Sequence, residues 1–79
     1  DVGERLNAKS LKRDIAVRLR DLRDYRGMTQ ADVTKASGMT QSSVARIESL
    51  MGPNPSLKTI ERYVEACNGQ MEILISAKN

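Results

Sequence analysis

The sequence predicts an all-α domain of four to five helices followed by one short C-terminal β-strand, and three observations predict this fold. The apolar residues, 39% of the 79, include no Phe or Trp, so the core has to come from aliphatic residues that favour helices. Apolar positions recur every three or four residues through most of the chain and alternate only near its end. A single domain of this size has a marginal core, so a partner subunit would help.

The first helix is predicted to begin at Ser10. Its inward apolar positions, at helical spacing, are Leu11, Ile15, Leu19 and Leu22. Charged residues are assigned to its other faces, among them Lys12, Arg13, Arg18, Arg20 and Asp21. Gly27 is expected to stop the helix as a left-handed cap. Residues 1–9 have no clear period and are interpreted as a flexible N-terminal arm.

A second helix of barely two turns is predicted to follow. Thr29 is well placed as its N-cap, with Asp32 standing where a capping box has Glu or Gln. The apolar face continues through Val33 and Ala36, and Gly38 ends the helix. Because a short turn containing Gly sets the angle between two helices in a helix-turn-helix, the spacing predicts that motif.

The third helix is predicted to start after Thr40, its N-cap, and most of its first turn is polar. Only Val44, Ala45 and Ile47 are apolar in it. A helix that turns amides, hydroxyls and an Arg outward near its N-terminus suits the DNA major groove, where these groups reach base edges. The net charge of +3 fits a polyanionic partner without specifying one.

A fourth helix is predicted to start at a cap on Ser56, because Gly and two Pro residues interrupt residues 50–55. Its inward positions are Leu57, Ile60 and Val64, and Asn68-Gly69 ends it. Residues 70–76 then alternate apolar and polar side chains, which is the period of a strand, with Leu74 as the one exception.

Several other side chains are interpreted structurally. Cys67 is expected to be a small buried hydrophobe, and Tyr25 and Tyr63 are expected to be half-buried at helical positions. The arginines of the first helix alternate with Asp21 and Asp24, so they predict a solvated helix face.

The run RDLRDYRGMTQADVTKASGMTQSSVARIE resembles the Xre and lambda-type repressor family of helix-turn-helix proteins, and the resemblance extends over about residues 11–67. The matching residues are Arg23, Gly27, Thr29, Gln30, Val33, Gly38, Thr40, Gln41, Ser42, Val44, Ile47 and Glu48. Two residues depart from the family pattern. Thr34 stands where Ala is usual at a close helix contact, and Leu50 stands where Gly commonly follows the Glu by two residues. The loop at residues 49–55 is therefore expected to run differently.

The resemblance implies a lambda-repressor-like DNA-binding domain over residues 10–69, with a recognition helix from about Gln41 to Ser49. Within that helix, base contacts are implied for Gln41, Ser42 and Arg46. Contacts to the DNA backbone are expected from Gln30, Thr40, Ser43, Lys35 and Lys58, because neutral base-reading side chains leave much of the affinity to phosphate contacts. The positions of Arg23 and Glu48 match a structural ion pair of the family that locks the helix orientation.

The predicted strand at residues 70–76 has no partner strand within the chain, and an unpaired strand edge invites another chain. A second copy, paired antiparallel across a two-fold axis, would place Met71, Ile73 and Ile75 over a helical core, while Leu74 would need cover from helices or a bound protein. Such a tail resembles antitoxins of the HigA and HipB type, which implies a toxin partner. The homodimer predicts an inverted-repeat operator in double-stranded DNA.

The leading hypothesis is a sequence-specific transcriptional repressor, the antitoxin of a type II toxin–antitoxin system, that autoregulates its operon and neutralises a toxin. Two alternatives stay open: a phage-type repressor or restriction-modification controller protein, and a protein-interaction module that does not bind DNA. No enzyme and no cofactor are expected, because the chain has no His and no glycine-rich phosphate loop. No apolar run approaches the roughly 20 residues that span a bilayer, which predicts a cytoplasmic protein of a bacterium or phage, nucleoid-associated when operator-bound.

Overall fold

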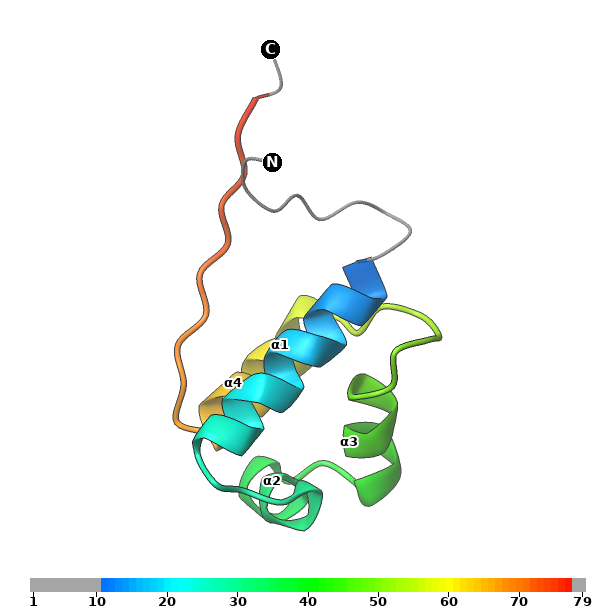
Figure 1. Ribbon diagram of the computed structural model, residues 1–79, viewed down its shortest axis with the longest axis vertical. Coiled ribbons are helices and arrows are strands. Elements are labelled where there is room, and N and C mark those ends of the chain that lie inside the picture. The colour runs from blue at the N-terminus through cyan, green and yellow to red at the C-terminus, as the bar shows by residue number, and fades with distance from the viewer. Residues whose placement is uncertain (1–10, 78–79) are drawn as a thin grey trace.

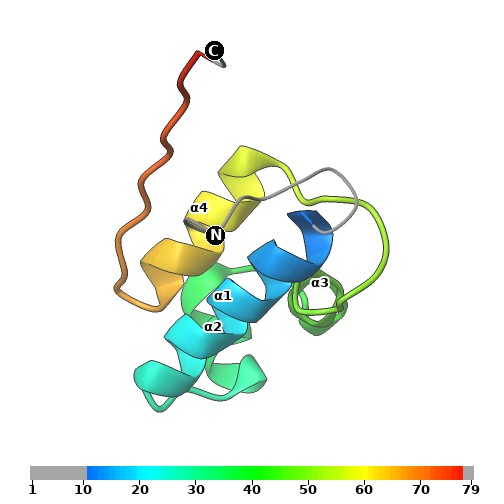
Figure 2. The same cartoon turned by 45° about the horizontal axis from the view of Figure 1, so that its top comes forward.

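The computed structural model describes residues 11–77 and forms four α-helices in that part of the chain (Figure 1). These are α1 (Leu11–Tyr25), α2 (Gln30–Ser37), α3 (Gln41–Ile47) and α4 (Leu57–Ala66). α1 and α4 lie side by side, and α2 and α3 pack beneath and beside them (Figures 1 and 2). The predicted all-helical body is confirmed, whereas the predicted arm at residues 1–9 lies outside the described residues. None of the helices in residues 11–77 has the length and apolarity needed to cross a membrane.

The three shorter helices begin at their predicted caps. The Thr29 hydroxyl accepts the N–H of Asp32 at 3.1 Å, and the Asp32 carboxylate accepts the N–H of Thr29 at 2.8 Å, which completes a capping box. The Thr40 hydroxyl accepts the N–H of Ser43 at 3.0 Å, and Ser56 caps α4 in the same way. These bonds satisfy backbone donors that a helix start leaves without a partner.

The helices differ in how they end. α1, α2 and α4 are each followed closely by a residue in the left-handed conformation, with φ of 68° at Gly27, 77° at Gly38 and 55° at Asn68. Such residues turn the chain so that its N–H groups meet the last helical carbonyls. After α3, Glu48 keeps a right-handed conformation, and Gly52 is the next described residue with positive φ. The N–H groups of Glu48 and Ser49 reach the carbonyls of Val44 and Arg46, so α3 ends without a left-handed turn close by.

The core is assembled from all four helices and the residue after α4. Its buried members are Leu19, Val33, Val44, Ile47, Ile60, Tyr63, Val64 and Cys67. Two inward predictions are wrong, since Ala36 is exposed and Leu57 is 61% exposed. α2 is only eight residues long and buries one position, Val33, while Leu57 begins α4 at the rim of a groove. Tyr63, expected to be half-buried, is fully buried.

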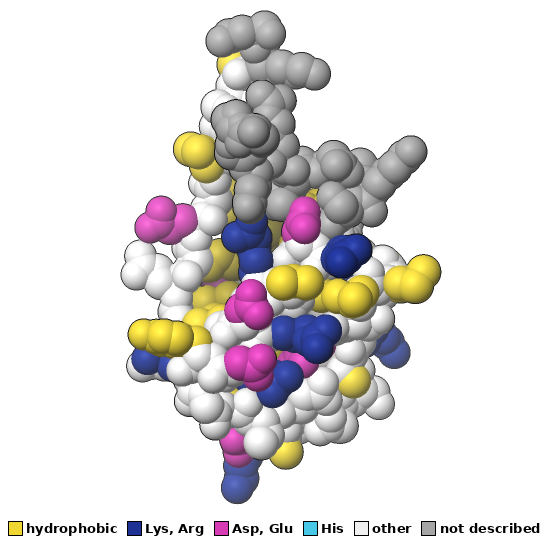
Figure 3. All heavy atoms as spheres, in the orientation of Figure 1, with side chains coloured by type: hydrophobic (Ala, Val, Ile, Leu, Met, Phe, Trp, Pro, Cys, Tyr) yellow, Lys and Arg dark blue, Asp and Glu magenta, His cyan; other side chains and the backbone are white. Residues whose placement is uncertain are grey.

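Residues 70–77 run extended along the side of α1 and α4 that faces away from α3 (Figures 1 and 2). Residues 11–77 contain no β-strand, so the strand predicted at residues 70–76 is not seen in the single chain. Met71 is half-buried against the core, whereas Ile73, Leu74 and Ile75 are 53%, 93% and 87% exposed. An apolar groove of about 490 Å³ lies between α1, α4 and this segment, and its lining appears as the yellow hollow beside the segment in Figure 3.

Candidate DNA-binding surface

α3 has one buried face and one exposed face. Val44 and Ile47 are 0% and 5% exposed, and they anchor the helix in the core. The outward residues are Gln41, Ser42, Ala45 and Arg46. The three residues predicted to contact bases therefore share the exposed side of one helix. The helix ends at Ile47, two residues earlier than the predicted end at Ser49.

The first turn of α3 is held by its own side chains. The Thr40 hydroxyl accepts the backbone N–H of Ser43 and also donates to the Ser43 hydroxyl at 2.9 Å. Thr40 is exposed and Ser43 is half-buried. Both residues, predicted to contact the DNA backbone, therefore act first as the cap that fixes the start of the helix.

Two glutamines link the start of α3 to the start of α2. The Gln41 Nε2 atom donates to Gln30 Oε1 at 2.9 Å, and Gln30 Nε2 donates to Glu48 Oε1 at 3.1 Å. The Thr34 hydroxyl lies 3.4 Å from Gln41 Oε1, so the residue that departs from the family pattern contacts the recognition helix. Gln30, predicted to contact phosphate, thus orients Gln41 and is itself oriented by Glu48.

Glu48 is the centre of a buried polar cluster, with a side chain that is 3% exposed. Arg23 donates to both of its carboxylate oxygens, from Nε at 2.8 Å and from Nη2 at 2.9 Å. The Tyr63 hydroxyl donates to the same carboxylate from α4. The structure therefore brings Arg23 and Glu48 together and adds Tyr63, which the sequence analysis did not assign to this pair. Its place in the stripe Ile60, Tyr63, Val64, Cys67 was the available signal for its burial.

The electrostatics of this cluster favour an ionised Glu48. Burial alone raises the pKa of its carboxyl, but hydrogen bonds from Arg23, Tyr63 and Gln30 outweigh burial and hold that pKa below its ordinary value. The hydrogen bond to Glu48 raises the pKa of Arg23, and burial raises the pKa of Tyr63 far above its ordinary value. Glu48 thus joins α1, α2 and α4 to the end of α3.

Lys12 lies against the end of α3, although the sequence analysis assigned it to a solvated face. The residue is 7% exposed, and its Nζ atom donates to the carbonyls of Arg46 and Ile47 at 3.2 Å each and to that of Ser49. Burial lowers the pKa of its ammonium group. Lys12 was misplaced because the buried face of α1 differs from the predicted one. The buried stripe of α1 is Lys12, Ala16 and Leu19, whereas the predicted residues Leu11, Ile15 and Leu22 are half-buried.

Comparison with known proteins agrees with this arrangement. A family model described as a helix-turn-helix domain matches residues 14–72, which is well over half of the chain. The chain belongs to the helix-turn-helix domain family. A relative named as a candidate antitoxin, HigA2, from Mycobacterium tuberculosis (strain ATCC 25618 / H37Rv), is 33% identical over 60 residues. That match covers 76% of this chain and 59% of the relative. No solved structure matches the chain significantly.

The predicted resemblance to Xre-type helix-turn-helix proteins of the HigA kind is thereby confirmed. In this helix-turn-helix, α2 and α3 are the two helices joined through Gly38. Arg62 of α4 donates to the carbonyl of Ser37 at 3.0 Å, which ties the turn to the core. The turn that orients the exposed face of α3 is therefore held in place by a side chain of α4.

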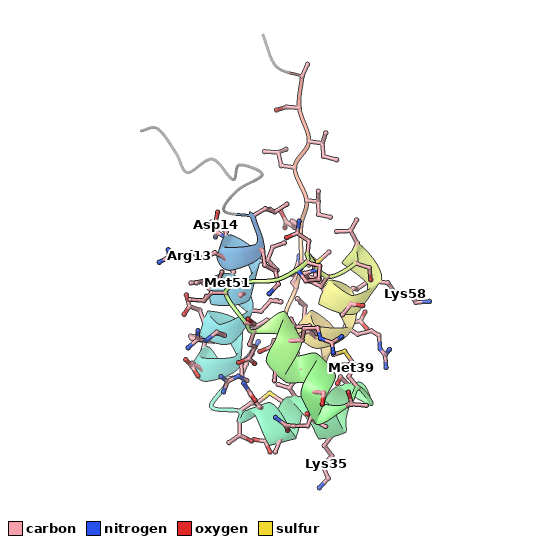
Figure 4. All side chains as sticks on the ribbon, turned by 90° about the vertical axis from the view of Figure 1, so that its right-hand side faces the viewer. Arg13, Asp14, Lys35, Met39, Met51 and Lys58 are labelled. Carbon is pink, nitrogen blue, oxygen red and sulfur yellow. The ribbon has the colours of Figure 1, made fainter. Side chains whose placement is uncertain are left out.

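Positive side chains surround the helix-turn-helix. Lys35 in the last turn of α2 and Lys58 in the first turn of α4 both extend away from the body in Figure 4. Both are exposed, as is Arg46. Within residues 11–77, no hydrogen bond or ion pair holds the charged ends of these three side chains. Their charges are available to phosphate groups near α3.

Cys67 and the potential metal-binding side chains of residues 11–77 indicate no second candidate site. Cys67 is fully buried, and burial raises the pKa of its thiol. Within residues 11–77, no group of three or more His, Cys, Asp or Glu is placed to hold a metal ion. The exposed surface of α3 is thus the best candidate site.

Proposed function

We propose that this protein is a sequence-specific transcriptional repressor that reads operator DNA with α3 and serves as the antitoxin of a type II toxin–antitoxin system. It represses its own operon and neutralises a toxin protein. The observation that carries the DNA-binding half is the exposed polar face of α3, on a helix whose other face is locked in the core. The name of the HigA2 relative supports the antitoxin half.

Base recognition is assigned to Gln41, Ser42 and Arg46. Gln41 is the best oriented of the three, because Gln30 accepts one of its amide hydrogens. A Gln side chain held in this way can donate to and accept from one adenine in the major groove, and Arg46 suits guanine. The hydroxyl of Ser42 can contact several bases, so it adds less specificity.

Backbone contacts are assigned to Lys35 and Lys58, with Gln30, Thr40 and Ser43 contributing neutral donors. Because two of the base-reading residues are uncharged, phosphate neutralisation supplies much of the affinity. Binding therefore weakens steeply as salt is added.

Dimerisation is assigned to residues 70–76. No backbone–backbone hydrogen bond joins residues 70–77 to the rest of the described chain, so this extended segment can take a second strand. With the two-fold axis at Ile73, Met71 of one copy lies opposite Ile75 of the other, on the side of the apolar groove. This register also keeps Glu72 opposite Leu74, whereas an axis at Glu72 would place two like charges together. Leu74 is left for a neighbouring helix or the toxin to cover.

The dimer determines the form of the operator. Two recognition helices related by a two-fold axis fit half-sites about 34 Å apart, which is one turn of B-DNA. The operator is therefore an inverted repeat in the promoter of the protein's own gene.

A fluorescence-anisotropy titration tests DNA recognition, using the upstream promoter duplex and a scrambled duplex at two salt concentrations. The promoter is expected to bind at least about 10³-fold more tightly than the scrambled duplex. Arg46→Ala is expected to weaken specific binding by about 1–3 kcal/mol. The matched control is Arg20→Ala, which removes one exposed charge from the solvated face of α1. Equal, salt-sensitive binding of both duplexes would support the interaction-module alternative instead.

The dimer and the toxin partner need separate tests. Ile73→Asp is expected to shift the sedimenting species from dimer to monomer, while Ser76→Asp, with the same added charge in the same segment, leaves the dimer intact. Co-purification with the product of the adjacent gene tests the toxin partner. A dimeric operator-binding protein that captures no neighbouring product would be the phage-type repressor or controller protein.

A further inference from the structure

α3 ends without the left-handed residue that closely follows each of the other three helices. Gly27, Gly38 and Asn68 adopt positive φ close after α1, α2 and α4, but the first such residue after α3 is Gly52, five residues beyond Ile47. Among the helices in residues 11–77, α3 is thus the one whose C-terminal end has no left-handed residue nearby.

Lys12 of α1 lies against the C-terminal end of α3. Its Nζ atom donates to three carbonyls, those of Arg46 and Ile47 within α3 and that of Ser49 in the following loop. An ammonium group has three protons, so this arrangement uses its whole donor capacity. A positive charge also suits a helix C-terminus, where the helix dipole is negative. Burial of the residue to 7% exposure excludes most competing water.

Apart from Lys12, the loop after α3 is held near this point by hydrogen bonds of Ser49, from its N–H to the carbonyl of Arg46 and between its hydroxyl and the backbone of Met51. A cavity of about 270 Å³ opens between α3, residues 53–55 of the loop and the start of α4, and Lys12 and Arg46 both line it. Leu50 and Met51 are 41% and 79% exposed. Figure 4 shows the loop that carries Met51 passing the first turn of α1, where Arg13 and Asp14 lie. The contacts from Lys12 therefore fix the path of this loop against α1.

We propose that Lys12 is a positioning residue, a C-cap supplied from α1 that holds the end of the recognition helix and thereby orients Arg46 for DNA. Lys12 contacts no DNA itself. The effect on DNA rests on the function proposed above, whereas the capping of α3 does not. The two parts are tested by separate measurements.

The first measurement uses the free protein. Lys12→Met keeps the apolar stem and removes the three donors, Lys12→Gln keeps one amide donor group, and Arg13→Met is the matched control with the same change in charge on the adjacent exposed residue. Amide hydrogen exchange by NMR is expected to speed up by about tenfold at Glu48 and Ser49 in Lys12→Met, to a smaller degree in Lys12→Gln, and not in Arg13→Met. Lys12→Gln also serves if Lys12→Met does not fold.

The second measurement uses operator and scrambled duplexes over a range of salt. Lys12→Met is expected to lower operator affinity about tenfold and to reduce the preference for operator, with an unchanged slope of log affinity against log salt. A lost phosphate contact would instead reduce that slope by about one and leave the preference intact.

Three results would overturn the proposal. Unchanged amide exchange in both Lys12 variants would show that the ammonium does not hold the end of α3. A reduced salt slope with intact preference would make Lys12 a phosphate ligand. Unchanged operator affinity despite faster exchange would show that the cap does not orient Arg46. If the unsubstituted protein shows no operator preference, the proposed function fails, and the exchange data still decide whether Lys12 caps α3.

Discussion

The two ends of α3 are held by different kinds of contact. At its start, Thr40 caps the helix through Ser43, three residues away. At its end, Glu48 meets Tyr63 and Arg23, 15 and 25 residues away, and Lys12 reaches carbonyls 34 to 37 residues away. The start of α3 is thus capped locally and contacts the neighbouring α2 through Gln41, whereas its end is held by side chains of α1 and α4.

We therefore expect the start of α3 to matter most for DNA recognition and its end to matter most for stability. The locally capped start leaves Gln41 and Ser42 exposed, so side chains there can change with limited effect on the core. The end contributes a buried ion pair and a buried lysine, whose substitution disturbs the helices that contact them. Variants at the end of α3 are therefore expected to lose stability first, and variants at its start to lose DNA recognition first.

The largest expected effect comes from Glu48→Gln. This substitution leaves the Arg23 guanidinium, 16% exposed, with only the exposed Asp24 carboxylate, 3.6 Å from its Nη1 atom, as a counter-charge. Breaking a buried pair in this way costs about 3–5 kcal/mol. Urea unfolding measures the change. Glu61→Gln, on the exposed face of α4, is the control and is expected to remain within about 0.5 kcal/mol of the parent. Similar values for both variants would contradict the central role assigned to Glu48.

A smaller effect is expected from Tyr63→Phe, which removes one donor to Glu48 and keeps the ring in the core. Loss of this bond costs about 1–3 kcal/mol at neutral pH. The pH dependence gives a second test. Because the folded-state pKa of Glu48 is lowered, its contribution to stability is present above the unfolded-state pKa and is lost as pH falls through the folded-state pKa.

Without the Tyr63 hydroxyl, the folded-state pKa of Glu48 moves up toward its ordinary value. The acid-induced loss of unfolding free energy should therefore be smaller in Tyr63→Phe than in the parent, measured by urea unfolding from neutral to acidic pH. The pKa of Asp32 is also lowered, by hydrogen bonds from Thr29, but this contribution is the same in both proteins and cancels in the difference. Parallel stability curves would show that Tyr63 does not act on the ionisation of Glu48.

Local signals explain what the sequence predicted well. The caps at Thr29, Thr40 and Ser56 each depend on a side chain and a backbone group three residues apart, so the sequence alone locates them. The turn at Gly38 likewise follows from one residue that accepts positive φ. These features were enough to predict four helices and the exposed face of α3.

Long-range contacts explain what the sequence analysis missed. Lys12 is charged, so periodicity assigned it to solvent, and only the packing of α1 against the end of α3 reveals the carbonyls it meets. The hydrogen bond from Tyr63 to Glu48 was missed for the same reason, because it joins α4 to the residue after α3 and periodicity does not show it. The alternation at residues 70–76 predicted a strand but not what would pair with it, and the single chain leaves the segment extended and without backbone hydrogen bonds to the rest of residues 11–77.

The smallest expected effect belongs to the start of α3. Thr40→Ala removes the acceptor for the Ser43 N–H and is expected to reduce the free energy of unfolding by about 1 kcal/mol, whereas Thr40→Gly should lie within a few tenths of the parent. Thr29→Ala is the matched comparison at α2, where Asp32 still accepts the backbone N–H of residue 29. Thermal unfolding ranks the three variants. If Thr40→Ala destabilises the protein as much as Glu48→Gln, the start of α3 is coupled to the core as strongly as its end, and the contrast between the two ends is wrong.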